Sequence, residues 1–140
     1  MKCWTRKFGI GAFGGLLMVV QASSAGAIDS SMAGIWGGDR LQLTIDAKGS
    51  AKLETDCASG AIDTPLALNA DGSFKAFGTF TQHHAGPERA DIPAGSTKAS
   101  YKGQVTDGSL MTLTIQSDAA KLPEVFTLRK GVKVKLIRCL

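Results

Sequence analysis

After residue 27 the sequence has no 12-residue stretch in which apolar residues recur with the 3.6-residue period of an amphipathic helix. The remainder of the chain is therefore not expected to be helical. It also lacks the CxxC, GxSxG and HExxH patterns. These patterns are typical of metal or redox cysteines, serine hydrolases and zinc peptidases, respectively. The sequence gives no direct support to any of these three classes.

Acidic residues are absent from the first 27 positions, where Lys2, Arg6 and Lys7 precede an apolar run over residues 8–20. The following segment ends in Ala-Gly-Ala, which is the small-x-small pattern of a signal peptidase site. We expect residues 1–27 to be a secretory signal peptide. The run holds 13 residues, four of them glycine, whereas a membrane-spanning helix needs about 20 apolar residues. A membrane-spanning protein is not expected, and a lipoprotein is not expected because no cysteine follows the run.

Removing the signal peptide changes the charge balance of the chain. The 16 Lys and Arg include the three basic residues of the signal, whereas all 12 Asp and Glu remain, so the mature chain carries 13 basic against 12 acidic residues. A near-neutral chain gives no support for binding nucleic acid or an anionic membrane. Cutting 27 of 140 residues leaves 113, which is the size of one domain, residues 28–140. We expect a monomer.

Cysteine is scarce, and only Cys57 and Cys139 remain after the signal peptide is cleaved. An even number of cysteines in a chain sent to an oxidising compartment predicts a disulfide. With 81 residues between them, chain-entropy arguments give it up to about 4–5 kcal/mol of stabilisation. Free thiols or metal ligands are the alternative. We expect an exported protein, either periplasmic or secreted.

Apolar and polar residues alternate along most of the remaining chain, which is the period of half-buried β-strands. The pattern predicts eight strands, at residues 40–46, 50–57, 60–69, 73–81, 99–106, 110–117, 125–130 and 132–140. Gly49, Gly72, Gly108 and Gly131 follow Asp, Asn or basic residues in sequences typical of hairpin turns. The spacing of these glycines indicates four equal hairpins, with about 13 extra residues between the second and third.

Eight short antiparallel strands in sequence order are expected to close into an all-β up-and-down barrel, because closure removes exposed strand edges. A two-sheet β-sandwich is the alternative. At eight strands the interior is either filled by side chains or holds one small ligand. The inward faces predicted from the alternation carry Leu41, Leu43, Ile45, Leu53, Ile62, Leu66, Leu68, Phe74, Phe80, Tyr101, Val105, Met111, Leu113, Ile115, Phe126, Leu128, Val134 and Leu136.

The Gly-Ile-Trp sequence at residues 34–36, together with Arg138 near the end of the chain, resembles the calycin pattern of lipocalins, avidins and fatty-acid-binding proteins. In that pattern an N-terminal Gly-x-Trp packs against a basic residue of the closing strand. The resemblance implies that the Arg138 guanidinium lies over a buried Trp36 ring at one end of the barrel.

The segments GIWGG, DCASGAIDTPL, ADGSFKAFGTF, HAGP and FTLRKG…RCL are similar to a set of small exported bacterial proteins of uncharacterised function. With the strands numbered as above, the long loops follow even-numbered strands and share an end of the barrel with both termini. Lipocalins and avidins open at the other end. The position of a ligand mouth is therefore open, and both cysteines are expected near Trp36, with a local bulge to join them.

The longest predicted loop, residues 82–98, holds two prolines and concentrates chemically versatile side chains, namely His83, His84, Glu88, Arg89 and Asp91. Adjacent histidines in an extended loop point in opposite directions, which disfavours a shared metal ion. Catalysis by a histidine and a carboxylate is the alternative. Asp56 and other acids near turns are interpreted as turn formers or solvated charges. The five basic residues of the last 13 are interpreted mainly as a solvated strand face.

These observations predict an exported, non-enzymatic binding or inhibitor-like module that uses the 82–98 loop. Long loops on rigid frames often carry recognition. The expected partner is a small apolar ligand or another protein, without a cofactor or metal. The alternative is a metal-dependent or hydrolytic enzyme that uses His83 or His84 as ligand or base. A cavity would favour a small ligand, and a filled core would favour a protein partner. Histidines and carboxylates that converge on one point would favour an enzyme.

Overall fold

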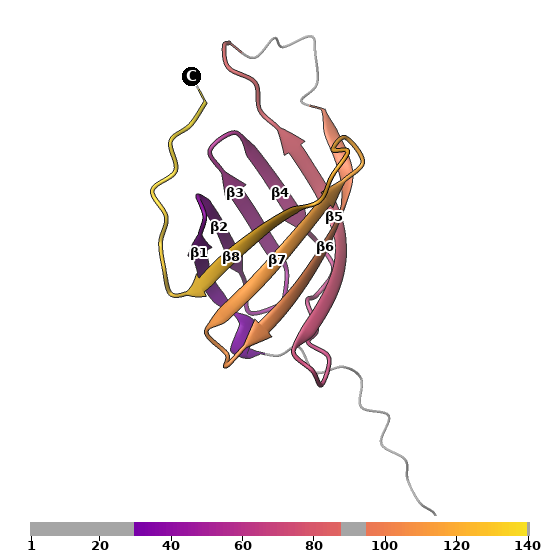
Figure 1. Ribbon diagram of the computed structural model, residues 1–140, viewed down its shortest axis with the longest axis vertical. Helices are drawn as coiled ribbons and strands as arrows, with labels where there is room; N and C mark the ends of the chain where they lie inside the picture. The colour runs from indigo at the N-terminus through magenta and orange to yellow at the C-terminus, as the bar shows by residue number, and fades with distance from the viewer. Residues whose placement is uncertain (1–29, 88–94, 140) are drawn as a thin grey trace, which may run out of the picture.

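The computed structural model describes residues 30–87 and 95–139 (Figure 1). The described chain starts with a short 3-10 turn, η1 (Ser30–Met32). Eight strands follow: β1 (Gly34–Gly38), β2 (Leu41–Ile45), β3 (Ala51–Thr55), β4 (Ala58–Ile62), β5 (Ser73–Gln82), β6 (Ser96–Thr106), β7 (Leu110–Ser117) and β8 (Glu124–Lys130). The first four strands have five residues each, whereas β5 and β6 have 10 and 11. One side of the wall is therefore shorter than the other.

The strands form a closed antiparallel barrel in which each strand pairs with its neighbour in sequence and β1 pairs with β8. This arrangement confirms the predicted all-β up-and-down barrel and rules out the sandwich. The closing pair is short, because only Trp36 and Gly37 stand opposite Lys130 and Arg129. Three of the four predicted turn glycines are confirmed as turns between strands, with φ of 87° at Gly49, 81° at Gly72 and 66° at Gly108, whereas Gly131 follows β8 and joins no further strand.

Side chains fill the barrel interior. Large residues with almost no exposed surface come from every strand except β5, from η1 and from the β4–β5 loop: Met32, Trp36, Leu41, Leu43, Leu53, Ile62, Leu66, Tyr101, Met111, Leu113 and Leu128. The loop between β4 and β5 adds to this core, because its Leu66 is only 2% exposed. Of the predicted interior residues, all lie in or against the core except Val134 and Leu136. The interior is thus a packed core, which is one of the two states expected for eight strands.

The prediction of a last strand at residues 132–140 is wrong, because β8 ends at Lys130 and residues 132–139 belong to no strand. The segment Gly34–Gly38 is the missing strand and occupies the position beside β8. Its three glycines gave it little β-propensity. The β1–β2 turn was also not predicted. Its two residues, Asp39 and Arg40, have positive φ of 48° and 60°, and neither is the glycine that usually marks such a turn.

Residues 132–139, here called the strap, run along the outside of the barrel. Figure 1 shows this yellow segment rising beside β1 and β2. Its path starts where the Gly131 amide donates a 2.7 Å hydrogen bond to the Ile35 carbonyl. A Cβ at Gly37 would lie 2.8 Å from Cγ2 of Val134 and closer still to the carbonyl oxygen of Val132. Gly37 therefore allows the strap to lie directly on β1.

The corrected strand order reverses the expected placement of the long loops. The connections that begin at residues 56, 83 and 118 follow odd-numbered strands, so they leave the barrel at the end opposite the start of β1. We call this the loop end, and the other the turn end. The sequence-based prediction that the loop placement differs from that of lipocalins is therefore wrong.

Candidate functional site

A groove of about 590 Å³ lies outside the barrel at the loop end. Its residues come from β2, β3 and β4, from the start of the β5–β6 connection, and from the strap: Gln42, Glu54, Thr55, Asp56, Ala58, Ser59, His83, His84, Gly86, Val134, Leu136, Arg138 and Cys139. Its volume falls within the range of about 300–1,000 Å³ typical of ligand pockets. The groove brings together three segments that are far apart in the sequence.

The floor of the groove is a row of polar side chains on three neighbouring strands. Gln42 pairs with Glu54 across β2 and β3, and Glu54 pairs with Ser59 across β3 and β4. Because successive side chains in a strand alternate between faces, residues next to buried leucines point outward. The same alternation that fills the core with Leu41, Leu43 and Leu53 thus places this row outside.

The two histidines form the side of the groove nearest the loop. The His83 amide donates a 2.7 Å hydrogen bond to the Cys57 carbonyl, which continues the β4–β5 pairing beyond the end of β5. The His83 Nε2 and Ser59 Oγ atoms lie 3.0 Å apart, at hydrogen-bond distance. His84 is exposed and also lines the groove.

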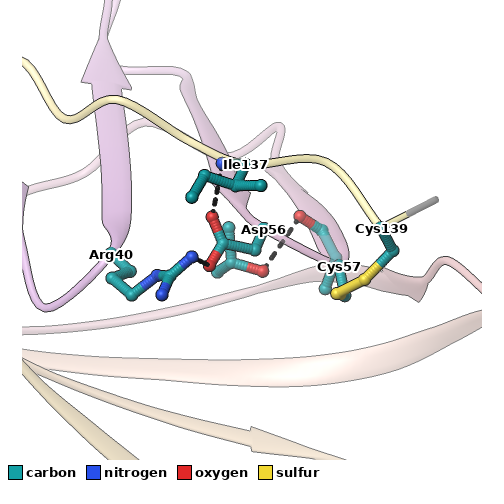
Figure 2. The surroundings of a disulfide bond; sticks show 7 residues. Arg40, Asp56, Cys57, Ile137 and Cys139 are labelled. Atoms are coloured by element: carbon teal, nitrogen blue, oxygen red, sulfur yellow. Dashed lines mark hydrogen bonds and ion pairs between the residues drawn. A yellow bond between two sulfur atoms is a disulfide. The ribbon is translucent and has the colours of Figure 1, made fainter.

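The strap forms the opposite side and is held by Asp56 and Cys57 (Figure 2). The Ile137 amide donates a 2.7 Å hydrogen bond to Asp56 Oδ1, and the Cys139 amide donates one of 3.2 Å to the Asp56 carbonyl. Arg40 forms an ion pair with the same carboxylate. The Ile137 hydrogen bond is the main cause that holds the Asp56 pKa below its usual value of 3.8, and Arg40 adds to it.

The predicted disulfide is present between Cys57 and Cys139, with their Cα atoms 5.3 Å apart. Cys57 lies in the β3–β4 connection at the loop end, and the strap brings Cys139 to it from outside the barrel. No strand bulge is needed, contrary to the expectation from the sequence. The bond lies at the loop end of the barrel, because the strap starts beside Ile35 and runs along the wall to Asp56. Such a bond is typical of an oxidising, extracytoplasmic environment.

The Trp36 ring is a plug of the core, as the calycin resemblance implied. Its exposure is 0%, and its Nε1 donates a 2.9 Å hydrogen bond to the Met32 carbonyl. The pairing with Arg138 is wrong, because Arg138 is exposed and lines the groove. The cation near the ring is Lys130, whose Nζ lies 5.8 Å from the ring centroid and also bonds the Ser31 carbonyl. A basic residue does meet the tryptophan, but it comes from the end of β8.

A second hollow of about 430 Å³ lies at the barrel mouth on the loop end. Phe80 and Ile115 contribute apolar surface, and Ser117 and Glu124 contribute polar atoms. These side chains belong to the inward faces of β5, β7 and β8. The hollow is limited to the top of the barrel, because the core fills the interior below it.

The structure places the predicted site residues in two groups. His83 and His84 lie together in the groove, whereas Glu88, Arg89 and Asp91 lie outside the described residues. Gln42, Glu54 and Ser59 were not predicted as site residues, because they occupy ordinary outward positions of their strands. Asp56, interpreted as a turn former or solvated charge, instead binds the strap. The fact that Asp56 directly precedes a cysteine was the one available hint.

Within residues 30–87 and 95–139, no group of three or more His, Cys, Asp or Glu side chains could hold a metal ion. Over the same part of the chain, no helix is long and apolar enough to cross a membrane. Comparison with protein-family models, curated proteins and solved structures found no match for the chain. The fold implied by the resemblance, an eight-stranded antiparallel closed barrel, is confirmed.

Proposed function

We propose that the chain is an exported, non-enzymatic binding or inhibitor-like module, and that a protein partner binds the groove and the loop beside it. The packed interior is the observation that carries this proposal. Because large side chains with almost no exposed surface occupy the barrel core, a ligand would have to bind outside it or only at its mouth. A filled core favours a protein partner over a small apolar ligand.

The groove has the features of a recognition surface. It presents hydrogen-bonding groups on Gln42 and Ser59, a carboxylate on Glu54 and a guanidinium on Arg138, beside apolar surface from Leu136. A mixture of apolar contact and directed polar groups provides affinity and specificity together. The groove is attached to a rigid closed sheet, so little order has to be gained on binding.

A photo-crosslinking experiment in the natural host tests the proposal. A benzoylphenylalanine residue replaces exposed His84 in the groove, and a matched variant carries it at Thr112. Thr112 is exposed on the outer face of β7, four strands away from β3 around the barrel. We expect a covalent adduct of protein mass at position 84 and none at position 112.

Other adduct patterns would contradict the proposal. Equal adducts at both positions would show that the contact is non-specific. An adduct with the mass of a lipid or metabolite at position 84 would instead assign the groove to a small ligand. The absence of any adduct at position 84, with the protein folded and exported, would remove the groove as the binding surface.

A hydrolytic enzyme is the second candidate, and one contact favours it. The Ser59 hydroxyl lies 3.0 Å from His83 Nε2, and both line the groove. A hydroxyl within reach of a basic imidazole is the first requirement of a serine nucleophile. A fluorophosphonate probe should label Ser59 if this reading holds, and the Ser59→Ala variant should then be unlabelled. The binding proposal expects no labelling of either protein.

A further inference from the structure

The groove has one wall that is not part of the barrel. The strap, residues 132–139, contributes Val134, Leu136, Arg138 and Cys139 to the lining. It forms no strand. The barrel closes before the strap begins, through the pairing of Trp36 with Lys130. None of the described buried core residues lies beyond Leu128. The strap is therefore an addition to a sheet that is already complete.

Few contacts hold the strap against the barrel. The Val134 amide meets Gln42 Oε1 at a long 3.4 Å, and the Ile137 and Cys139 amides bond Asp56. The Ile137 hydrogen bond is exposed and the Val134 hydrogen bond is only partly buried. Such hydrogen bonds contribute little net stability, since water competes for the same groups. Each residue of the strap loses backbone freedom when it docks, which opposes docking. The Cys57–Cys139 bond is the only covalent attachment of the strap to β2–β4 among the described residues.

We propose that the Cys57–Cys139 disulfide is a redox latch that builds the groove, so that partner binding depends on the oxidised state. This inference rests on the proposed function of the groove. In the oxidised protein the strap closes one side of the groove. In the reduced protein the strap leaves the surface and the groove loses that wall, while the barrel stays folded.

The reduction step uses an external dithiol. One thiolate of the dithiol attacks a sulfur of the Cys57–Cys139 bond and releases the other cysteine as a thiolate, which takes up a proton. The second thiol of the dithiol loses its proton and resolves the mixed disulfide, which leaves two cysteine thiols and an oxidised dithiol. Both cysteines are partly exposed, and Cys139 faces the groove, so a thiolate can approach them.

Amide hydrogen exchange measured by NMR tests the latch without any partner. The probes are the Val134, Ile137 and Cys139 amides of the strap, and the controls are Leu43 and Leu113 in β2 and β7. On reduction by dithiothreitol, we expect exchange of the strap amides to accelerate at least about tenfold while the controls stay protected, because local opening and global unfolding are separate events. Strap amides that keep their protection after reduction would overturn the proposal.

A shortened chain covers the case in which the reduced protein unfolds. A variant that ends at Gly131 lacks the strap, and we expect it to show the same protected amides in β2 and β7. If neither the reduced protein nor this variant folds, the strap is part of the barrel's stability and the latch is wrong. A control variant, Asp56→Asn, keeps the disulfide and removes only the carboxylate; its strap should exchange faster than wild type but slower than the reduced protein.

The crosslinker at position 84 then separates this inference from the proposed function. Loss of the protein adduct on reduction supports both. An adduct that persists unchanged in the reduced protein would overturn redox control and leave the binding function standing. Absence of an adduct in both states, together with a strap that is released on reduction, would reject the binding function and leave the latch.

Discussion

The Ile137 amide donates a 2.7 Å hydrogen bond to the Asp56 carboxylate, and this contact joins the end of the chain to the end of β3. Asp56 and Cys57 are neighbours in sequence, and they bind Ile137 and Cys139, respectively. One link is a hydrogen bond to a carboxylate, which acid can weaken by protonating it, and the other is a covalent bond, which a reductant can break. The two links should therefore respond separately to acid and to a reductant.

Acid is predicted to loosen the strap. Since the folded-state pKa of Asp56 is lowered, mainly by the Ile137 hydrogen bond, the carboxylate's contribution is fully present above its unfolded pKa, about 3.9. It is lost as the pH falls through the lower folded value. We expect the Ile137 amide signal to titrate with a midpoint below 3.8. The control Asp56→Asn should show no such titration, and a midpoint above 4 in wild type would contradict the assignment.

Trp36→Ala should destabilise the barrel by about 3–5 kcal/mol, which is typical of deleting a buried aromatic side chain. Arg138→Ala should change stability by less than about 0.5 kcal/mol, because its side chain is exposed. Urea unfolding followed by circular dichroism measures both. A nearly neutral Trp36→Ala would show that the ring does not stabilise the core, and a large effect of Arg138→Ala would show that this exposed side chain makes a stabilising contact.

The alternation of apolar residues was sufficient to predict the number of strands, the antiparallel order and most of the core. It was not sufficient to number the strands correctly. Residues 132–139 alternate as a strand does, but the edge beside β8 is already taken by Gly34–Gly38. Periodicity reports which side chains can be buried, and cannot show which of two segments closes a barrel. Packing decides between these two segments, because Gly34–Gly38 carries the Trp36 ring that fills the interior.

The candidate site was predictable only in part. The unusual His83-His84 pair and the even cysteine count were visible in the sequence, and the structure brings both features to one groove. Gln42, Glu54 and Ser59 were not visible, because polar residues on an outward strand face are the rule. Their significance depends on the strap, which forms one side of the groove above them. Its position follows from the disulfide and from the space that Gly37 leaves.

Alkaline conditions are predicted to destabilise the barrel through Tyr101. Burial raises the Tyr101 pKa to about 12, and its hydroxyl donates a 2.6 Å hydrogen bond to the Thr79 carbonyl. The stabilising effect of the neutral phenol is complete below the unfolded pKa, about 10, and is lost as the pH rises toward 12. Urea midpoints should fall over this range in wild type. They should fall less in Tyr101→Phe, and an equal fall would exclude Tyr101 as the cause.

A small residue at position 60 is predicted to be required beside the same tyrosine. A Cβ on Gly60 would overlap the Tyr101 hydroxyl and lie 3.1 Å from the Thr79 carbonyl oxygen. We expect Gly60→Ala to cost about 1–3 kcal/mol, as overpacked cores do. Combining Gly60→Ala with Tyr101→Phe removes the clashing oxygen and should recover part of the loss in urea unfolding. No recovery would place the strain in the backbone instead.

Replacing both His83 and His84 with alanine should leave the barrel folded. His84 is exposed, and the change removes the His83 contact to Ser59. We therefore expect urea unfolding to show a stability loss of up to about 1.5 kcal/mol. A recognition surface distributes binding over many contacts, so the double variant should weaken partner capture without abolishing it, as measured by crosslinking from Glu54 in the groove. A metal ligand or a catalytic base cannot be replaced by its neighbours. Complete loss of a bound metal or of a hydrolytic activity in this variant, with the fold intact, would therefore establish the enzyme in place of the binding module.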